Sequence, residues 1–334
     1  MAPAMKALVV TAPNVFGWQD LPMPIPGPEQ ALVRIEACGF CNATDRELIA
    51  GVQPYRPPFP FILGHEAVGT VVEVGSACTE FKVGDRVTRP NCGALAGFAS
   101  GWSGFAEYGL VMSGQADYNA QRQLALPPGL EPEWAFMAIS LAETRAFLDQ
   151  VIEASRPISG APVVVVGTGI NGLTLTHWAK RLGAAPVVTL GRRAERLELA
   201  RAGGADAVVN LRDPDCAAAV RDLTGGGAAL LLEAIGQPAV LAGFGPLLAP
   251  DGLVGIYGAA DGAAYRAAAE ALAPAVVLQP GPEEQRYTRA MAEEILAGTV
   301  PAALWRTHVW EPAAFPEAVA AVARGEVVKG CVRL

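Results

Sequence analysis

The residues best suited to chemistry in this 334-residue chain lie around Gly64-His65-Glu66. Imidazole and carboxylate groups are zinc-type ligands, and here they stand side by side after a glycine that allows close backbone approach. Cys41 lies upstream and adds a thiolate, so that soft and borderline ligands can converge on one point. We therefore predict a metal site built from Cys41, His65 and Glu66.

A second chemical signal is the glycine-rich loop over residues 167–172. The loop follows the apolar run 162–166 and precedes a segment in which apolar residues have helical spacing. In that context a GxGxxG pattern predicts a dinucleotide site, with Gly167 at the tight turn, Gly169 against the pyrophosphate and Gly172 at the helix–strand contact. The alternative is an ordinary turn between a strand and a helix.

The end of the next apolar strand indicates which dinucleotide would bind. An NAD site usually carries Asp or Glu there, whereas this chain has Gly191-Arg192-Arg193. No carboxylate repels a 2′-phosphate, and arginine donates bidentate hydrogen bonds to phosphate oxygens, so we predict NADP(H) rather than NAD(H). The alternative is that the two arginines only begin a solvated helix. The residues assigned to the cofactor are Gly167, Thr168, Gly169, Ile170, Asn171, Gly172, Gly191, Arg192 and Arg193.

The elements that must position these groups change in character near residue 161. The first ~130 residues suggest short strands broken by glycine and proline, and a helix follows over residues 131–152. Beyond residue 161, buried-type strands alternate with helices, which indicates βαβ units and a parallel sheet. The predicted strands are 162–166, 187–190, 206–209, 229–233 and 253–257, with 274–279 as a further candidate. Helices over 287–297 and 312–324 and a strand-like tail over 327–334 complete the prediction.

Composition excludes several classes of function. The net charge of −8 argues against nucleic acid as a partner, and no apolar run reaches the ~20 residues of a membrane span. The first residues lack a signal-peptide pattern, and six cysteines in 334 residues do not form a disulfide framework. We therefore expect a soluble, cytoplasmic enzyme that acts on a small molecule.

Taken together, these motifs resemble the medium-chain dehydrogenase/reductase family, which includes the zinc alcohol and polyol dehydrogenases. The resemblance implies an α/β fold in which a GroES-like β-rich catalytic domain is joined to a Rossmann doubly wound parallel-sheet domain. It places the catalytic domain at residues 1–150, completed by about 290–334, and the Rossmann domain at 151–289. It also implies an active site in the cleft between the domains and assembly into a homo-dimer or homo-tetramer.

Carried over by motif, the resemblance assigns roles to individual residues. Cys41 and His65 match the family's zinc ligands, and Glu66 matches a residue that lies at the metal as a ligand or beside one. Asp45 matches an acidic residue that orients the site. Thr44 matches the hydroxyl that accepts the substrate's proton, although one additional residue separates it from Cys41.

The sequence departs from the family pattern at the third zinc ligand. Ala138 occupies the position where the family carries Cys or Glu, and Glu143 is five residues further along the same helix. Glu66, Glu143 or water could complete one catalytic zinc site, and weak or absent zinc binding is the remaining alternative. The family's second, structural zinc requires four cysteines, but the matching region has only Cys92, so we predict no structural zinc.

These observations predict an NADP(H)-dependent, zinc-dependent oxidoreductase that interconverts an alcohol and a carbonyl. Zinc would act as a Lewis acid, and the nicotinamide would exchange the hydride. The segment 44–48 resembles the sugar and polyol dehydrogenases of this family, and this resemblance implies a secondary alcohol on a polyol, sugar or cyclitol. Two alternatives stay open: a zinc-free reductase of the same superfamily that acts on enones or quinones, and a non-catalytic relative that binds nucleotide.

Overall fold

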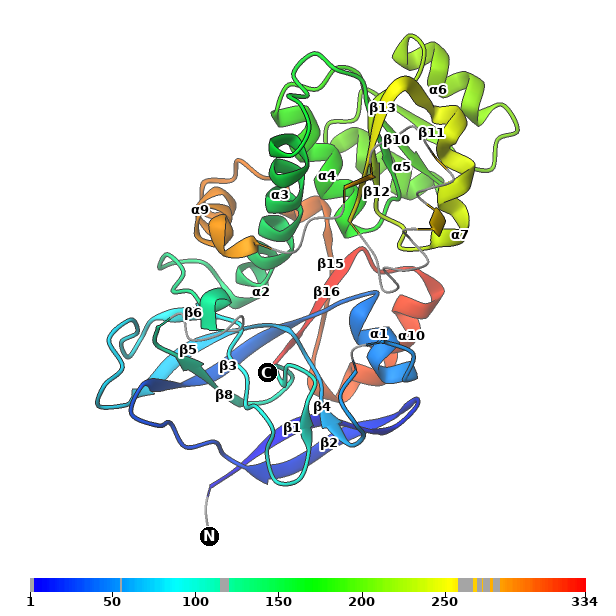
Figure 1. The fold of residues 1–334 in the computed structure, drawn as a ribbon. Coiled ribbons are helices and arrows are strands. Elements are labelled where there is room, and N and C mark those ends of the chain that lie inside the picture. Colours follow the sequence, from blue (N-terminus) through cyan, green and yellow to red (C-terminus); the bar gives the residue numbers. More distant parts are fainter. Residues whose placement is uncertain are drawn as a thin grey trace. The chain divides into compact units, whose positions relative to one another are not determined.

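The structure is a computed structural model that describes residues 3–54, 56–114, 120–257, 267–268, 272, 277–278 and 283–334. The chain divides into two compact units (Figure 1). The first unit combines Met1–Ile139 with Gln285–Leu334, and the second is Ser140–Glu284. The division therefore falls inside the helix α3 (Met137–Glu153) rather than at residue 150.

Two β-sheets form the first unit. One has the order β2-β1-β4-β7, and the other has the order β15-β16-β3-β5-β6 with β8 paired to β3. The strands are β1 (Ala4–Ala12), β2 (Val15–Pro22), β3 (Gln30–Phe40), β4 (Phe61–Ile62), β5 (Glu66–Val74), β6 (Arg86–Thr88), β7 (Ala99–Ser100), β8 (Tyr108–Met112), β15 (Arg306–Trp310) and β16 (Lys329–Arg333). The helices are α1 (Thr44–Ala50), α2 (Pro132–Ala135), α9 (Thr288–Ala297) and α10 (Phe315–Arg324).

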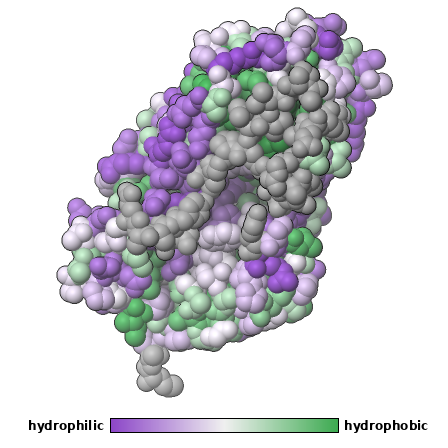
Figure 2. All heavy atoms as spheres, viewed as in Figure 1, coloured by the Kyte–Doolittle hydropathy of each residue, from purple (hydrophilic) through white to green (hydrophobic). Residues whose placement is uncertain are grey.

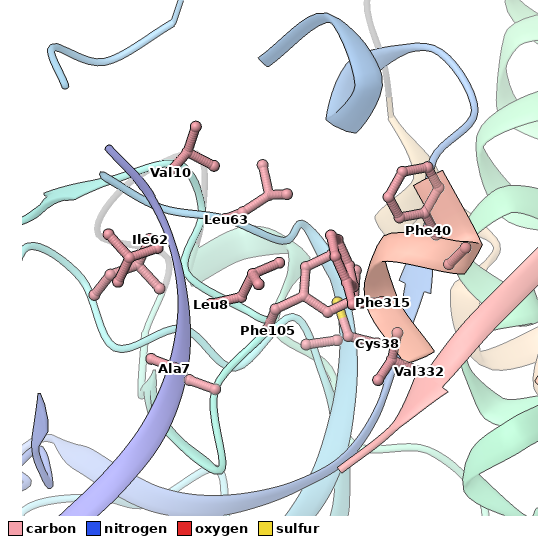
Figure 3. Packing of buried hydrophobic residues seen from close by; sticks show 14 of the residues in the cluster. Ala7, Leu8, Val10, Cys38, Phe40, Ile62, Leu63, Phe105, Phe315 and Val332 are labelled. Atoms are coloured by element: carbon pink, nitrogen blue, oxygen red, sulfur yellow. The ribbon is translucent and has the colours of Figure 1, made fainter. Parts of the chain in front are cut away.

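The C-terminal tail is an integral part of this first unit. Strand β16 pairs antiparallel with β3, and the red C-terminal strands lie beside the blue β3 in Figure 1. Figure 3 shows Phe315 of α10 among Leu8, Phe105 and Cys38. The Phe315 ring lies 5.2 Å from the Phe105 ring and 5.5 Å from the Phe40 ring, centroid to centroid. These edge-to-face contacts tie the last helix to a core formed mainly by the first 110 residues.

The second unit is built on one parallel sheet with the order β11-β10-β9-β12-β13-β14. This is the 3-2-1-4-5-6 order of a Rossmann fold, so the predicted doubly wound domain is confirmed. Its strands are β9 (Val163–Val166), β10 (Val187–Gly191), β11 (Ala207–Asn210), β12 (Ala228–Glu233), β13 (Leu248–Ile256) and β14 (Val277–Leu278). The main connecting helices are α4 (Ile170–Arg181), α5 (Ala194–Ala202), α6 (Cys216–Thr224) and α7 (Pro238–Leu241). Of the candidate strand 274–279, only residues 277–278 are among those described.

The surface in Figure 2 mixes hydrophilic purple with pale and green residues. The exposed large hydrophobic side chains include Val15, Ile25, Val52 and Val83, which come from separate segments. Scattered apolar side chains of this kind are ordinary for a globular surface. Within the ranges that the structure describes, no helix has the length and apolar character required to cross a bilayer.

Candidate functional site

Three neighbouring strands of the first unit bring the predicted metal ligands together. Because β3 runs antiparallel to β5 and to β16, the end of β3 meets the beginnings of the other two strands. In this register Gly39 pairs with Glu66, and Phe40 pairs with Gly330. A side chain at Gly39 would overlap the Glu66 carboxylate, so glycine leaves the space that this carboxylate occupies.

The candidate metal centre consists of one donor atom from each of Cys41, His65 and Glu66. The three donor atoms lie within 4.8 Å of one another. Cys41 and His65 are partly exposed, and Glu66 is buried. Thiolate, imidazole and carboxylate together suit zinc, and three protein ligands would leave a coordination position for substrate or water. The residues present therefore fit a catalytic zinc ion.

Asp45 holds two of these ligands with one carboxylate. His65 Nδ1 donates to Asp45 Oδ1 over 3.1 Å, and the Cys41 backbone N–H donates to Asp45 Oδ2 over 2.8 Å. Asp45 is fully buried at the second position of α1. Because Nδ1 is bonded to Asp45, the Nε2 atom is the ring nitrogen available to the other donor atoms, and it lies 3.8 Å from Glu66 Oε1. Such a carboxylate fixes the tautomer and orientation of a metal-binding histidine.

Lys329 is a member of the site that sequence reasoning missed. Its Nζ atom lies 2.6 Å from Oε1 and 2.5 Å from Oε2 of Glu66, and both side chains are almost completely buried. Glu66 would therefore share its carboxylate between Lys329 and a bound metal. The available signal was a single charged residue within the apolar run 327–332.

The electrostatics of the site shift the pKa of the Cys41 thiol and the pKa of the His65 imidazole in opposite directions. Burial alone would raise the pKa of the Cys41 thiol, but the hydrogen bond and charge of His65, with the charge of Lys329, leave that pKa below its usual value. Burial would lower the pKa of His65, but the charge and hydrogen bond of Asp45 and the contact with Cys41 raise it well above the usual value. A metal that binds here therefore competes with the imidazole proton.

Thr44, Ala138 and Glu143 are not among the three donors of this cluster. Thr44 is the first residue of α1, and its hydroxyl makes no hydrogen bond to any part of the chain that the structure describes. Ala138 is buried and offers no ligand atom. Glu143 belongs to the second unit, where its carboxylate accepts a hydrogen bond from the Tyr257 hydroxyl over 3.2 Å.

A small pocket opens beside His65. Its lining consists of Gly64, His65, Arg89, Pro90, Asn91 and Trp102, and its volume of about 10 Å³ is roughly the room that one water molecule needs. The Trp102 ring lies 5.4 Å from the His65 ring, centroid to centroid. Trp102 adopts a φ of 63°, which is uncommon outside glycine. The pocket therefore combines an aromatic wall with polar groups next to a candidate metal ligand.

The glycine loop of the second unit lies between β9 and α4. Gly167 has a φ of 121°, which favours glycine, and a Cβ at Gly172 would overlap the Gly167 carbonyl. Gly169 is the N-cap of α4, and a Cβ there would meet no atom within 4 Å. The backbone N–H groups at this helix terminus can receive a phosphate. Thr168 packs so closely on Gly191 that a Cβ at Gly191 would lie 2.6 Å from Thr168 Cγ2.

Three arginines gather where β10 ends and α5 begins. Arg192 and Arg193 are exposed, and Arg193 is the N-cap of α5. Arg196, which the sequence analysis did not single out, is buried on the first turn of that helix. Burial lowers the pKa of Arg196, and the charge of Arg193 lowers it further. The end of β10 is therefore a cationic surface suited to an anion.

Two protein families match this chain. Residues 27–118 match the family described as "Alcohol dehydrogenase GroES-like domain", which confirms the predicted catalytic domain, and residues 171–275 match "Zinc-binding dehydrogenase". An alcohol dehydrogenase of Cupriavidus necator is 32% identical over 289 residues, which is 77% of each chain. A sorbitol dehydrogenase of Halalkalibacterium halodurans is 33% identical over 248 residues, which is 70% of each chain.

Solved structures show the same architecture. Benzyl alcohol dehydrogenase from Acinetobacter calcoaceticus has a TM-score of 0.82 and 20% identity over 99% of both chains. A dehydrogenase from Sinorhizobium meliloti 1021, solved with NADP bound, has a TM-score of 0.79 and 26% identity over 99% of this chain and 100% of that one. The chain thus belongs to the zinc-type medium-chain dehydrogenase/reductase family and is an oxidoreductase of the alcohol dehydrogenase type.

Proposed function

We propose that this oxidoreductase interconverts a secondary alcohol and a carbonyl compound with NADP(H) and one zinc ion. The convergence of Cys41, His65 and Glu66 donor atoms within 4.8 Å carries the proposal. When bound, the zinc ion would supply a Lewis acid for the substrate oxygen, and the nicotinamide would supply or accept the hydride.

The residues around the ligands have distinct tasks in this proposal. Asp45 holds the His65 ring and the Cys41 backbone in place through hydrogen bonds of 3.1 and 2.8 Å. Thr44 is a partly exposed residue, and its hydroxyl can accept the substrate's proton. Arg192 and Arg193 present guanidinium groups to the cofactor's 2′-phosphate. The related Sinorhizobium dehydrogenase, which was solved with NADP, supports this choice of cofactor.

We favour a polyol, sugar or cyclitol as the substrate. The sorbitol dehydrogenase relative supports this class. A panel that compares kcat/KM for polyols, sugars and cyclitols with simple secondary alcohols tests the preference. Higher values for the simple alcohols would reject it.

Metal analysis of protein purified without added zinc or chelator tests the metal. We expect about one zinc per chain, because three protein ligands suit a catalytic zinc site. Cys41→Ser should lose the metal and most alcohol dehydrogenase activity. Cys78→Ser is the matched control, since Cys78 is a partly exposed free thiol of the same unit outside the cluster. A wild-type protein that binds no zinc would reject the proposed metal.

Cofactor kinetics test the arginines. The ratio of kcat/KM with NADPH to that with NADH should exceed one, and Arg192→Ala with Arg193→Ala should lower it roughly 10- to 100-fold, the effect of losing one charged hydrogen bond. Arg201→Ala is the control, because Arg201 lies in the last turn of the same helix. An unchanged ratio in the double variant would refute NADP(H) selection by these residues.

A zinc-free reductase that acts on enones or quinones is the second candidate. Lys329 contacts both Glu66 oxygens, and Ala138 offers no ligand atom, so both observations favour this alternative. Activity of Cys41→Ser on enones and quinones separates the two candidates. The zinc-free enzyme should retain most of its activity, whereas the zinc enzyme should lose its alcohol activity.

We also propose a homo-dimer or homo-tetramer in the cytoplasm. All six cysteines are free thiols, which supports a reducing compartment. Light scattering coupled to size-exclusion chromatography tests the assembly, and a monomer would contradict it.

A further inference from the structure

Asn42 connects the segment that carries Cys41 to the C-terminal tail. Its Nδ2 atom donates to the Val327 carbonyl over 3.0 Å and to the Val328 carbonyl over 3.0 Å. Asn42 directly follows the candidate ligand Cys41, and the acceptors directly precede Lys329. One side chain therefore spans 285 residues of sequence at the edge of the candidate metal centre.

The two hydrogen bonds fix the orientation of the Asn42 amide. They use both N–H groups of one nitrogen, and the acceptor residues Val327 and Val328 are buried. The Oδ1 atom of the same amide is buried without a hydrogen-bond partner in the described part of the chain. The two N–H groups of Nδ2 thus determine how the Asn42 amide is oriented.

Asn42 and Asp45 hold the Cys41 segment from two sides. Asp45 accepts the Cys41 backbone N–H on the α1 side, and Asn42 anchors the following residue to the tail. Lys329, the next residue of the tail, contacts the Glu66 carboxylate. Residues 327–329 therefore contact the candidate metal centre at two places. Val327 and Val328 bind Asn42, which follows Cys41, and Lys329 binds Glu66.

We propose that Asn42 is a positioning residue that sets the place of the Cys41 thiolate for metal binding through the carbonyls of Val327 and Val328. The inference rests on the proposed function, namely that the cluster binds zinc. A purely structural tether would affect stability without changing the metal affinity of the folded protein. Partners that orient metal ligands instead change metal affinity by roughly 10- to 100-fold when they are removed.

The experiment compares Asn42→Ala, Asn42→Asp and Trp18→Phe with the wild-type chain. Asn42→Asp keeps the shape of the side chain but removes both donors. Trp18→Phe is the matched control, because Trp18 Nε1 donates to the Pro312 carbonyl over 2.8 Å and so ties the N-terminal part to the C-terminal part outside the cluster. Zinc affinity is measured by competition with a chromogenic chelator, and the cobalt(II)-substituted proteins report the thiolate-to-cobalt charge-transfer band.

Both Asn42 variants should bind zinc roughly 10- to 100-fold more weakly and should show a weaker or shifted charge-transfer band. Trp18→Phe should match the wild type in both measurements. Circular dichroism identifies any variant that fails to fold, and the other Asn42 variant then decides the result. Unchanged affinity and an unchanged band in a folded Asn42 variant would overturn only this inference. A wild-type chain that binds neither metal would overturn the proposed zinc site and this inference with it.

Discussion

The candidate metal centre and the glycine loop are built in opposite ways. The loop is contiguous, because all its glycines lie within residues 167–172, between one strand and the helix that follows. The candidate metal centre draws Cys41 from the end of β3, His65 and Glu66 from the start of β5, and Lys329 from the tail, 263 residues after Glu66. The first site depends on local backbone conformation, and the second depends on the register of three paired strands.

The two regions also differ in the forces that hold them. At the loop, backbone groups contact one another. Glycine is required at Gly172, where a Cβ would overlap the Gly167 carbonyl, and is favoured at Gly167, whose φ is 121°. At the metal centre, buried charges offset one another through the pairs Lys329–Glu66 and His65–Asp45. Removal of one partner of a buried pair is expensive, so the metal centre should be the more sensitive region.

The largest expected effect is that of Lys329→Met. This variant leaves the Glu66 carboxylate buried without its cation, so the free energy of unfolding should fall by about 3–5 kcal/mol in urea titrations of chelator-treated protein. Combined replacement of Lys329 by Met and Glu66 by Gln should recover most of that loss. Lys6→Met removes the exposed pair with Asp20 and should cost less than about 1 kcal/mol. A Lys329 effect as small as that of Lys6 would remove the distinction between the two regions.

The next effect tests the glycine loop. Gly172→Ala places a methyl group against the Gly167 carbonyl and should lower the free energy of unfolding by about 1–3 kcal/mol. Gly169→Ala meets no atom within 4 Å, so stability should change by less than about 0.5 kcal/mol. Its methyl group would instead obstruct phosphate at the helix terminus, and titration with NADPH should show weaker binding. Equal stability of the two variants would contradict this division of tasks.

A smaller effect is expected at Asp45. Asp45→Asn keeps the shape of the side chain but weakens its hold on His65 and on the Cys41 backbone. Zinc affinity should fall roughly 10- to 100-fold, as measured by chelator competition, while the dissociation constant for NADPH stays unchanged. Asp20→Asn, at an exposed position of the same unit, serves as the control. A change in NADPH affinity alone would show that the two sites are not separable in this way.

The smallest effect concerns Asp206 in the second unit, whose carboxylate accepts from Lys180 and from the Val187 N–H. Burial would raise the pKa of Asp206, but the Lys180 and Val187 hydrogen bonds outweigh it and hold the pKa below its usual value. This stabilisation is present above the unfolded pKa of about 3.9 and is lost as pH falls through the lower folded pKa.

Asp206→Asn should therefore cost about 1 kcal/mol at neutral pH and little in strong acid. This value of about 1 kcal/mol allows for solvent screening, because the Lys180 and Asp206 side chains are 42% and 36% exposed. Urea titrations at both pH values check it. If the difference in the free energy of unfolding between Asp206→Asn and the wild type is the same at both pH values, the lowered pKa of Asp206 is contradicted.

Local patterns explain which predictions were accurate. The run 162–166 and the glycines after it specify a strand, a turn and a helix within a dozen residues, and β9 and α4 follow that order. The prediction of helix over 131–152 divides into α2 and α3, with the division between the units inside α3. Helix α1, which carries Thr44 and Asp45, was not predicted, because its seven residues are too few for a clear periodic pattern.

The amino-acid sequence by itself determined the chemical types at both sites: the donors Cys41, His65 and Glu66, and the glycines and arginines of the cofactor loop. Tertiary structure alone decided that Lys329 contacts the Glu66 carboxylate and that Asn42 binds the carbonyls of Val327 and Val328. Their positions depend on the pairing of β16 with β3 and on the packing of Phe315 in the core of the first unit. Contacts between residues more than 260 positions apart are set by that packing, and neither local propensity nor periodicity encodes them.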